Sequence, residues 1–444
     1  MRILIITTFF PPQNSIASHR PFSWAKYWSL AGNEITVVTT PKNSDDESAL
    51  NFGNSNFDVV ELPFGKTFER LRSIYRKDRP SVKQTAVMGE KPVRKTSLLR
   101  KMLGLLDNYR RRSGVFDMRR FPDFSHFWVG NVVSWASENG PWDLVVSTYA
   151  PYTTHLAGYR LKKKGVAKFW VADYRDLWTD DHIFKGIPVL RFYERSLERK
   201  LVSEADMLTS VSDPLCDKLY KRFGKDCINI QNGYEPEDLE SIPARNIFQE
   251  LPNKKRIVYT GSIYKSTRDP SPLFQAIALI AESEDGKILL EDLEVIFVGG
   301  NSDVLDEMIA HYGVSKWVKL GGLISRQEAL MMQRDADILL FLESNANGVE
   351  GILTGKIFEY ISSGTEIWAL GVTQDSSPGR LLVSCNCGKV FANDMQSIYV
   401  ELLSLLKGKH KIKSNIEFDS LFQYTREALA LKMLNKIKSG MRIG

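Results

Sequence analysis

The feature that most constrains the fold of this chain is a regular alternation of short apolar runs with amphipathic helical patterns. Within the first 40 residues, an apolar run (3–10) is followed by a Pro-containing loop (11–20), a helical pattern (21–32) and a second apolar run (34–40). Short runs that are apolar throughout are typical of buried parallel strands. The order predicts a βαβ unit, whose first loop lies at the carboxyl end of a strand, where open α/β sheets bind ligands.

The same alternation continues along the chain and predicts two separate sheets. Further strands of the first series are expected at 58–63, 143–150, 168–176, 205–212 and 227–233, with helices at 153–165 and 188–204. A second series has strands at 256–263, 293–300, 317–322 and 336–344, and helices at 270–283, 302–313 and 325–335. Residues 231–239 combine Asn-Gly, Pro and acidic residues, as is typical of a hinge. We expect an α/β protein with two doubly wound, Rossmann-like domains, 1–232 and 233–420, and a C-terminal helix (421–444) that packs back toward the first domain.

Composition narrows the class of protein. The chain has 444 residues, 43% of them hydrophobic and 25% charged, as in globular proteins. Its apolar runs, such as 336–342, are far shorter than the roughly 18 residues of a membrane span. The apolar N-terminus is too short for a signal peptide. Four cysteines without a further Cys or His cluster predict neither a disulfide framework nor a zinc site, so we expect a cytoplasmic protein.

The charge of the chain is unevenly distributed. The whole chain has a formal net charge of +6, but residues 66–120 hold 17 Lys and Arg against 5 Asp and Glu, which gives this segment +12 and the remainder −6. Five apolar residues accompany these charges at helical spacing: Leu98, Leu99, Met102, Leu105 and Leu106. A core-packing helix, a solvated arm and an amphipathic helix on an anionic membrane all stay open. Only the membrane interpretation accounts for both the charges and the leucines.

The stretch GILTGKIFEYISSG (351–364) is the strongest candidate for a binding site. It predicts a helix that begins near Thr354 and ends at Gly364, with Lys356 and Glu359 on one face. A helix N-terminus beside a lysine suits a diphosphate, and a carboxylate one turn further in can accept hydrogen bonds from ribose hydroxyls. The alternative is an ordinary capped helix whose Lys and Glu form a surface pair.

These features together resemble the GT-B glycosyltransferases, and within them the family 4-like enzymes of bacterial surface-polysaccharide biosynthesis. The resemblance is carried by four stretches in family order: 9–28, 147–165 with 170–181, 230–239, and 351–364. It implies two Rossmann-like domains facing a cleft. It also implies a retaining, metal-independent hexosyltransferase without a cofactor, which moves a sugar from a UDP- or GDP-linked donor to a glycan acceptor. The acceptor would be lipid-linked, in capsule, O-antigen (lipopolysaccharide) or exopolysaccharide synthesis, on the inner face of the membrane.

The resemblance also assigns donor-side residues. Glu359 matches the family glutamate that binds the donor ribose, whereas the partner glutamate of the family is replaced by Gly351, with Glu350 as the nearest acid. Ser262 stands where many members have an arginine, so Arg268 and Lys356 are the expected diphosphate pair, and we count both as catalytic. The remaining expected donor contacts are Gln13, Asn14, Ser15, Gly261, Gly322, Ile324, Gly351, Ile352, Leu353 and Thr354.

Candidates for the acceptor side lie in the first series. His155 is expected either to face the cleft as a catalytic residue or to cap the start of its helix. Arg175 and Asp176 follow a buried strand together with Asp173, and they are either acceptor-side and catalytic groups or parts of a structural Arg–Asp cluster. His19 and Arg20 flank the first loop and are acceptor-side candidates.

Three other classes of function compete with glycosyl transfer. A GT-B nucleotide-sugar 2-epimerase would need no acceptor surface, and the basic segment 66–120 argues against it. Nucleic-acid binding by that segment is disfavoured because its aromatic residues are sparse. A dinucleotide-dependent dehydrogenase is disfavoured because no G-x-G-x-x-G follows the first strand. Asp335 and Asp337 imitate an Asp-x-Asp metal motif, but the apolar strand follows them instead of preceding them, so we expect no metal there.

Overall fold

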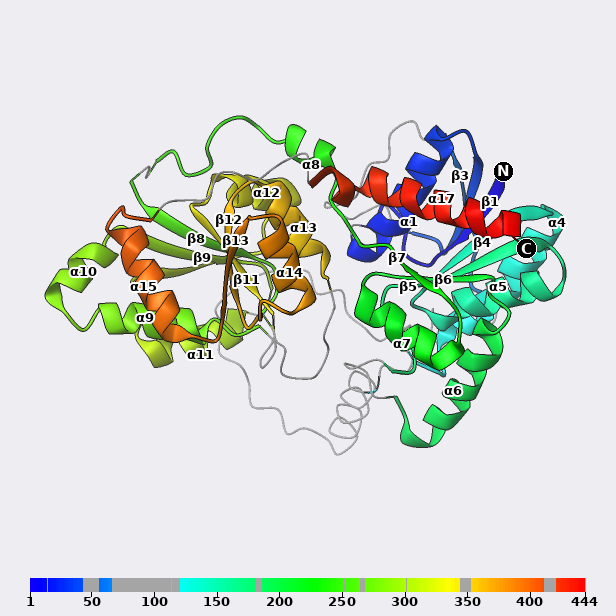
Figure 1. The fold of residues 1–444 in the computed structure, drawn as a ribbon, viewed down its shortest axis with the longest axis horizontal. Coiled ribbons are helices and arrows are strands. Elements are labelled where there is room, and N and C mark those ends of the chain that lie inside the picture. The colour runs from blue at the N-terminus through cyan, green and yellow to red at the C-terminus, as the bar shows by residue number, and fades with distance from the viewer. Residues whose placement is uncertain are drawn as a thin grey trace, which may run out of the picture. The chain divides into compact units, whose positions relative to one another are not determined.

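The computed structural model describes residues 1–13, 15–42, 56–65, 113, 120–180, 186–250, 253–263, 268–300, 302–343, 353–410 and 421–443. Most of the basic segment 66–120 lies outside the described residues, as do Asn14, Glu350, Gly351 and Ile352. The chain divides into two compact units: residues 1–211, 215–229 and 433–444 form unit 1, and residues 212–214 and 230–432 form unit 2 (Figure 1). No helix in the described part of the chain is long and apolar enough to cross a membrane.

Unit 1 is built on a seven-stranded parallel sheet in the order β3-β2-β1-β4-β5-β6-β7. Its strands are β1 (Arg2–Ile6), β2 (Glu34–Thr39), β3 (Asp58–Glu61), β4 (Trp142–Tyr149), β5 (Ala167–Tyr174), β6 (Met207–Ser210) and β7 (Cys227–Asn229). The chain turns from one half of the sheet to the other between β1 and β4. Parallel sheets bind ligands at such a reversal, beyond the carboxyl ends of the strands.

The helices of unit 1 are α1 (Ile16–Leu30), α4 (Val129–Glu138), α5 (Tyr152–Lys163), α6 (Pro188–Val202) and α7 (Asp213–Phe223), with a 3₁₀ turn η1 (Phe124–Trp128). The expectation that the first helix starts at Pro21 is wrong, because the helix begins at Ile16 and contains Pro21. Ser15 occupies the N-cap, where its side chain accepts a hydrogen bond from the backbone of Ser18. This cap satisfies an otherwise unpaired N–H group of the first turn.

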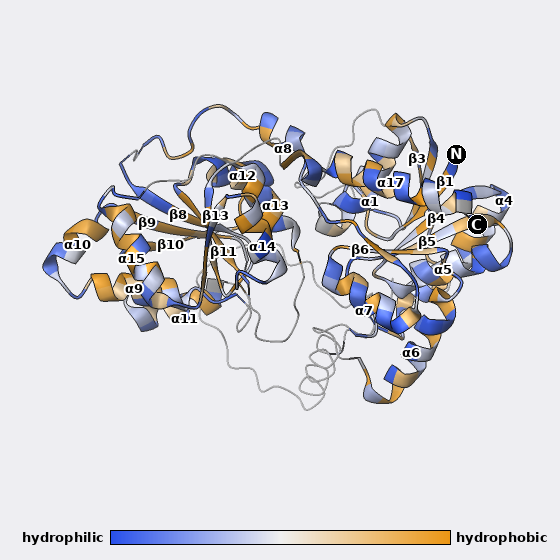
Figure 2. Ribbon diagram, in the orientation of Figure 1, coloured by the Kyte–Doolittle hydropathy of each residue, from blue (hydrophilic) through white to orange (hydrophobic). Residues whose placement is uncertain are grey.

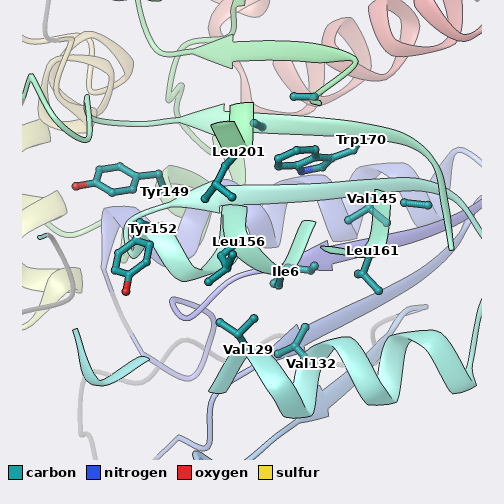
Figure 3. Close-up of a cluster of buried hydrophobic side chains, with 14 of the residues drawn as sticks. Ile6, Val129, Val132, Val145, Tyr149, Tyr152, Leu156, Leu161, Trp170 and Leu201 are labelled. Carbon is teal, nitrogen blue, oxygen red and sulfur yellow. The ribbon is translucent and has the colours of Figure 1, made fainter. Parts of the chain in front are cut away.

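The core of unit 1 forms where α4, α5 and α6 cover one face of the sheet. Figure 3 shows its members, among them Ile6 and Val145 from strands, Leu156 and Leu161 from α5, and Trp170 from β5. All are buried. In Figure 2 the apolar colouring is concentrated in the central strands of both units, as expected for strands with both faces covered by helices.

Unit 2 is built on a six-stranded parallel sheet in the order β10-β9-β8-β11-β12-β13. Its strands are β8 (Lys255–Thr260), β9 (Leu293–Val298), β10 (Val318–Gly322), β11 (Ile338–Leu342), β12 (Glu366–Leu370) and β13 (Gly388–Ala392). Its helices are α8 (Pro236–Glu240), α9 (Ser271–Ile280), α10 (Glu284–Leu290), α11 (Ser302–Tyr312), α12 (Arg326–Asp335), α13 (Gly355–Ser362), α14 (Ser377–Ser384) and α15 (Met395–Leu406), with a 3₁₀ turn η2 (Phe422–Tyr424).

The sheet of unit 2 lies between two helical layers. Successive residues of a strand point to opposite faces, and along β11 Leu340 packs with α9 and α15, whereas Leu339 packs with α13 and α14. The last helix, α17 (Arg426–Ile443), has its first residues in unit 2 and its later residues in unit 1. Tyr234 pairs with the segment before α17, through its backbone N–H to the carbonyl of Tyr424 at 3.1 Å.

Candidate functional site

The candidate site of unit 2 lies at the carboxyl edge of its sheet, where the strand order reverses between β8 and β11. Gly261 follows β8 with a φ of +132°, and Gly299 follows β9 with a φ of +137°. A Cβ atom at Gly299 would overlap the backbone of Gly261, and one at Gly261 would overlap the Lys356 ammonium. Glycine is therefore required at both positions, because no larger residue allows the loops and the lysine to approach so closely.

Helix α13 brings Lys356 to this edge. Its N-cap position is Thr354, and it ends before Gly364, which has a φ of +78°, as the sequence predicts. Ile357, Tyr360 and Ile361 are buried and anchor the helix. Lys356 Nζ donates a hydrogen bond to the Tyr259 hydroxyl at 3.0 Å, and it lies 4.1 Å from the centre of that ring. The lysine is thereby fixed above β8.

Arg268 and Glu343 complete the charged groups around Lys356. Arg268 Nη1 donates to the carbonyl of Ser262 at 2.8 Å, and Tyr259 donates to the same carbonyl at 3.0 Å. Glu343 follows the last residue of β11, and burial raises the pKa of its carboxyl group, against the opposing effect of Arg268 and Lys356. The two cations expected to bind diphosphate are therefore brought into one electrostatic cluster.

The pKa of Lys356 is lowered to about 7, first by burial and then by the positive charge of Arg268, while Glu343 and Glu359 act in the opposite direction. A lysine with this pKa gains or loses its proton near neutral pH. An anionic ligand would restore the full positive charge, because a neighbouring negative charge favours the protonated form. The cluster is thus suited to bind a dianionic or trianionic group such as a diphosphate.

Glu359 lies one turn further along α13 and forms an ion pair that the sequence does not reveal. Arg326 Nη1 contacts Glu359 Oε1 at 2.8 Å, and Arg326 Nη2 contacts Asp238 Oδ2 at 2.7 Å. Burial opposes the charge of Arg326, but the two carboxylates outweigh it and raise the pKa of the guanidinium. The pair is made through one oxygen of Glu359, Oε1.

Three further donor-side candidates of unit 2 lie near the same edge. Leu353 is buried, and its carbonyl accepts a hydrogen bond from Asn232 at 3.1 Å, which fixes the start of α13 to the segment that enters unit 2. The carbonyl of Gly322, whose φ is +67°, accepts from the backbone of Gly299 at 2.7 Å. Ile324 is partly buried against the cluster that includes α13. Leu353 directly precedes α13, Gly322 is the last residue of β10, and Ile324 follows that strand.

In unit 1, Arg20 and Asp173 form a buried ion pair. Arg20 Nη2 lies 2.7 Å from Asp173 Oδ1, and both side chains are almost fully buried. The hydroxyls of Thr148 and Thr209 also donate to Asp173. Burial alone would raise the pKa of Asp173, but Arg20 and the two hydroxyls hold it below its usual range. Asp173 is therefore paired with Arg20 of α1, and these contacts occupy much of the Arg20 side chain.

His155 does not face a cleft and does not cap its helix. Its ring is fully buried among Tyr149, Trp170 and Tyr174, and burial lowers its pKa to about 3. Its Nδ1 lies 2.8 Å from the Ser147 hydroxyl, which also accepts from Trp170 Nε1 at 2.9 Å. These contacts join α5 to β4 and β5, and none of them supports the expected catalytic role of His155.

The remaining candidates of unit 1 lie near the carboxyl ends of β1 and β5. Arg175 donates to the carbonyls of Tyr149 and Ala150 and lies 5.2 Å from the ring of Phe9. Asp176 is partly exposed beside it. Gln13 and Ser15 precede or cap α1, and His19 is buried in its first turns. The catalytic role of Asp176 and the ligand contacts of the other four residues stay predictions.

Asp335 and Asp337 are engaged in ordinary contacts. Asp335 accepts from the backbone of Ile247 at 2.8 Å and pairs with Arg334, while Asp337 accepts from the backbone of Arg256 at 2.8 Å. Within the described ranges, no group of three or more His, Cys, Asp or Glu residues could hold a metal ion. The two aspartates fix the start of β8 and the segment before it.

No family model and no curated protein matches the chain, whereas solved structures do. Sucrose-phosphate synthase from Thermosynechococcus elongatus aligns with a TM-score of 0.63 and 12% identity over 100% of this chain and 99% of that one. The Anabaena protein HepE, in complex with UDP and glucose, aligns with a TM-score of 0.60 and 12% identity over 99% and 100%. The lipopolysaccharide outer core galactosyltransferase WaaB aligns with a TM-score of 0.57 and 11% identity over 99% of each chain.

The chain has the GT-B fold. The predicted fold class of two Rossmann-like parallel sheets is thereby confirmed.

Sequence reasoning missed three charged residues of the candidate site in unit 2: Arg326, Glu343 and Asp238. Arg326 contacts Glu359 across 33 residues of sequence, and Asp238 lies 88 residues from Arg326, so no local spacing links them. Glu343 could have been suspected from the sequence, because it directly follows an apolar strand and therefore lies at the carboxyl edge of a parallel sheet, where ligands bind.

Proposed function

We propose that this chain is a retaining glycosyltransferase that uses a UDP- or GDP-linked sugar as its donor. The proposal is carried by one observation: two cations, Lys356 and Arg268, meet beside the glycine-lined carboxyl edge and the start of α13. Similar folds support it, since HepE was solved with UDP and glucose and WaaB is described as a galactosyltransferase.

In the proposed reaction the protein stabilises the departing nucleoside diphosphate. Negative charge grows on the diphosphate as the bond to the sugar breaks, and preorganised positive groups there lower the barrier. Lys356 and Arg268 supply these charges, and the unpaired N–H groups at the start of α13 add to them. Glu359 would hold the ribose and so place the diphosphate against the lysine.

A panel of nucleotides tests the class of donor. UDP or GDP should raise the melting temperature of the protein, whereas NAD should not, because only ligands that bind the folded state stabilise it. Lys356→Met keeps the length of the side chain and should remove most of the shift. Stabilisation by NAD alone, or equal shifts in the parent and in Lys356→Met, would contradict the proposal. Conversion of the donor into its 2-epimer without an acceptor would instead identify an epimerase.

We extend the proposal to a lipid-linked acceptor at the inner face of the membrane, as in capsule, O-antigen or exopolysaccharide synthesis. Its support is the composition of residues 66–120, whose net charge of +12 suits an anionic leaflet. Radiolabelled sugar transfer to polyprenyl-linked and to free oligosaccharides, compared side by side, tests this extension. Equal rates with free sugars would contradict it.

A further inference from the structure

Helix α6 of unit 1 exposes apolar side chains that a water-soluble surface usually covers. Val189 is 85% exposed, Phe192 is 82% exposed and Tyr193 is 50% exposed. The three lie within five residues of one another, so they form one patch on the first two turns. Leaving such a patch in water is unfavourable by about 25 cal/mol for each Å² of apolar surface, and contiguous patches usually mark binding surfaces.

The acidic residues of α6 are turned inward. Glu194 is fully buried, where it lies 3.6 Å from Arg120 Nη1 and accepts from the backbone of Phe121 at 2.8 Å. Glu198 is 1% exposed and accepts from the Tyr174 hydroxyl at 3.2 Å. Burial raises the pKa of both carboxyl groups, against the opposing hydrogen bonds and positive charges around them. The negative charges of the helix are therefore hidden from the surface.

The basic residues of α6 are all turned outward. Arg191, Arg195, Arg199 and Lys200 are exposed, on the same helix as the apolar patch (Figure 2). Asp180 is the acid that the structure places beside them, at 3.3 Å from Arg195. Next to the helix lies a hollow of about 440 Å³, lined by Asp180, Phe192, Arg195, Ser196, Arg199 and Arg222. Cationic heads therefore surround an exposed aromatic ring.

We propose that α6 docks unit 1 on an anionic phospholipid surface. Arginine and lysine side chains can bind lipid phosphates while Val189, Phe192 and Tyr193 enter the boundary between headgroups and acyl chains. A purely electrostatic partner would explain the cations but not the exposed valine and phenylalanine. A purely apolar partner would not explain why both glutamates are buried and every cation of the helix is exposed.

This docking goes beyond the proposed reaction and does not depend on it, because lipid binding is measured without donor or acceptor. It also differs from a role of residues 66–120, since α6 is a separate, described helix. A glycosyltransferase could fail to bind lipid through α6, and a chain without transferase activity could still bind.

Flotation with vesicles tests the proposal on the full chain. The parent should float with vesicles of 70% phosphatidylcholine and 30% phosphatidylglycerol, and it should bind pure phosphatidylcholine far more weakly. Raising the salt from about 0.1 to about 0.5 M should reduce binding, because the Debye length shortens with ionic strength. Absence of binding to anionic vesicles overturns the proposal and leaves an acidic protein as the partner that fits this face.

Two sets of variants distinguish the contribution of the basic side chains to vesicle binding from that of the apolar side chains. Arg191→Gln, Arg199→Gln and Lys200→Gln together should reduce partitioning roughly a hundredfold, since each basic residue near the surface contributes about a fivefold factor. Val189→Ala with Phe192→Ala should reduce binding at least about tenfold even at low salt. All five side chains are exposed, so the fold should be unchanged, which circular dichroism and the melting temperature check.

Matched controls carry the same changes elsewhere on exposed surface. Lys407→Gln, Lys409→Gln and Lys436→Gln remove the same charge, and Ile288→Ala with Val383→Ala remove comparable apolar surface; both should bind like the parent. Equal losses in the controls overturn the assignment to α6. So does binding that ignores the α6 changes but is abolished by Arg110→Glu, Arg111→Glu and Arg112→Glu, a result that would assign lipid binding to residues 66–120.

Discussion

At the scale of single residues, the lowered pKa of Lys356 makes the affinity for an anionic ligand depend on pH. Burial and the charge of Arg268 lower its pKa to about 7. The protonated form is the one that attracts a diphosphate. Binding of a ligand that requires this form is therefore accompanied by protonation of Lys356 whenever the pH exceeds the pKa of the lysine, so the affinity depends on pH.

This linkage gives a first prediction. The affinity for UDP should be highest near pH 7 and should fall by up to about tenfold for each pH unit above it. The terminal phosphate of UDP ionises near pH 6, so its own titration is complete in this range. Isothermal titration calorimetry between pH 7.5 and 9, in two buffers of different ionisation enthalpy, measures both the affinity and the proton uptake. Lys356→Met should bind weakly at every pH, and an unchanged pH dependence in that variant would contradict the assignment.

A second prediction concerns Glu359 and its ion pair. Glu359→Ala should weaken UDP binding by about 2–4 kcal/mol, because charge-assisted hydrogen bonds to the ribose are lost. Arg326→Gln should cost less, since it only loosens the orientation of the carboxylate. Calorimetric titration of both single variants and of the double variant gives their coupling. Fully additive losses would show that Arg326 does not act through Glu359, and a Glu359→Ala variant that binds like the parent would remove the ribose assignment.

The same residues show which parts of the site can be predicted from the sequence and which depend on tertiary packing. Lys356 and Glu359 could be predicted because they lie on one helix, three residues apart, where local spacing determines which face they share. Arg326 and Asp238 could not, since their contacts depend on how α8 and α12 pack beside α13. His155 was misjudged for a related reason. Its position on the helix was expected, but its burial follows from the three aromatic rings around it.

At the scale of elements, buried parallel strands were predictable and helix ends were less so. Strands such as β1, β4 and β9 are mostly apolar and almost entirely buried, because helices cover both faces of the sheet. Proline is common at the first position of a helix, so Pro21 predicts a start that lies five residues after the true one at Ile16, where Ser15 provides a side-chain cap. The sequence predicts no specific element between 365 and 420, where the structure has β12, α14, β13 and α15; β13, for example, carries Gly and Lys and is only partly buried.

The packing of α5 on β5 gives a third prediction. Gly158 lies in α5 against the indole ring of Trp170, and a Cβ atom there would overlap the ring. Gly158→Ala should therefore destabilise the protein by about 1–3 kcal/mol through overpacking, although alanine favours helices. Gly130→Ala in α4 is the matched control, because its Cβ would meet nothing within 4 Å. It should stabilise by about 0.5–1 kcal/mol. Urea denaturation followed by tryptophan fluorescence measures both, and equal effects would contradict the packing argument.

At the scale of the whole molecule, the proposed donor site uses cations where other enzymes use a metal ion. Lys356, Arg268 and the start of α13 already neutralise a diphosphate, so we expect no requirement for a divalent ion. Transferase activity should persist in excess EDTA, measured against the same enzyme with added Mg²⁺ or Mn²⁺. A complete loss that either ion reverses would contradict this fourth prediction and would direct attention back to Asp335 and Asp337.

The two units also have separate hydrophobic cores, so a ligand of unit 2 should stabilise that unit first. All described charged groups of the proposed donor site lie in unit 2. At a concentration of UDP about 100 times its dissociation constant, the stabilisation is about 2.7 kcal/mol, which for a unit of this size raises the melting temperature by roughly 5–10 °C. Differential scanning calorimetry can assign the two unfolding transitions, because Gly158→Ala should lower the transition temperature of unit 1. In this variant, UDP should raise the temperature of the other transition. When Lys356→Met is added to Gly158→Ala, UDP should leave the temperature of that other transition unchanged. A shift confined to the transition that Gly158→Ala lowers would place the nucleotide in unit 1 and contradict the site.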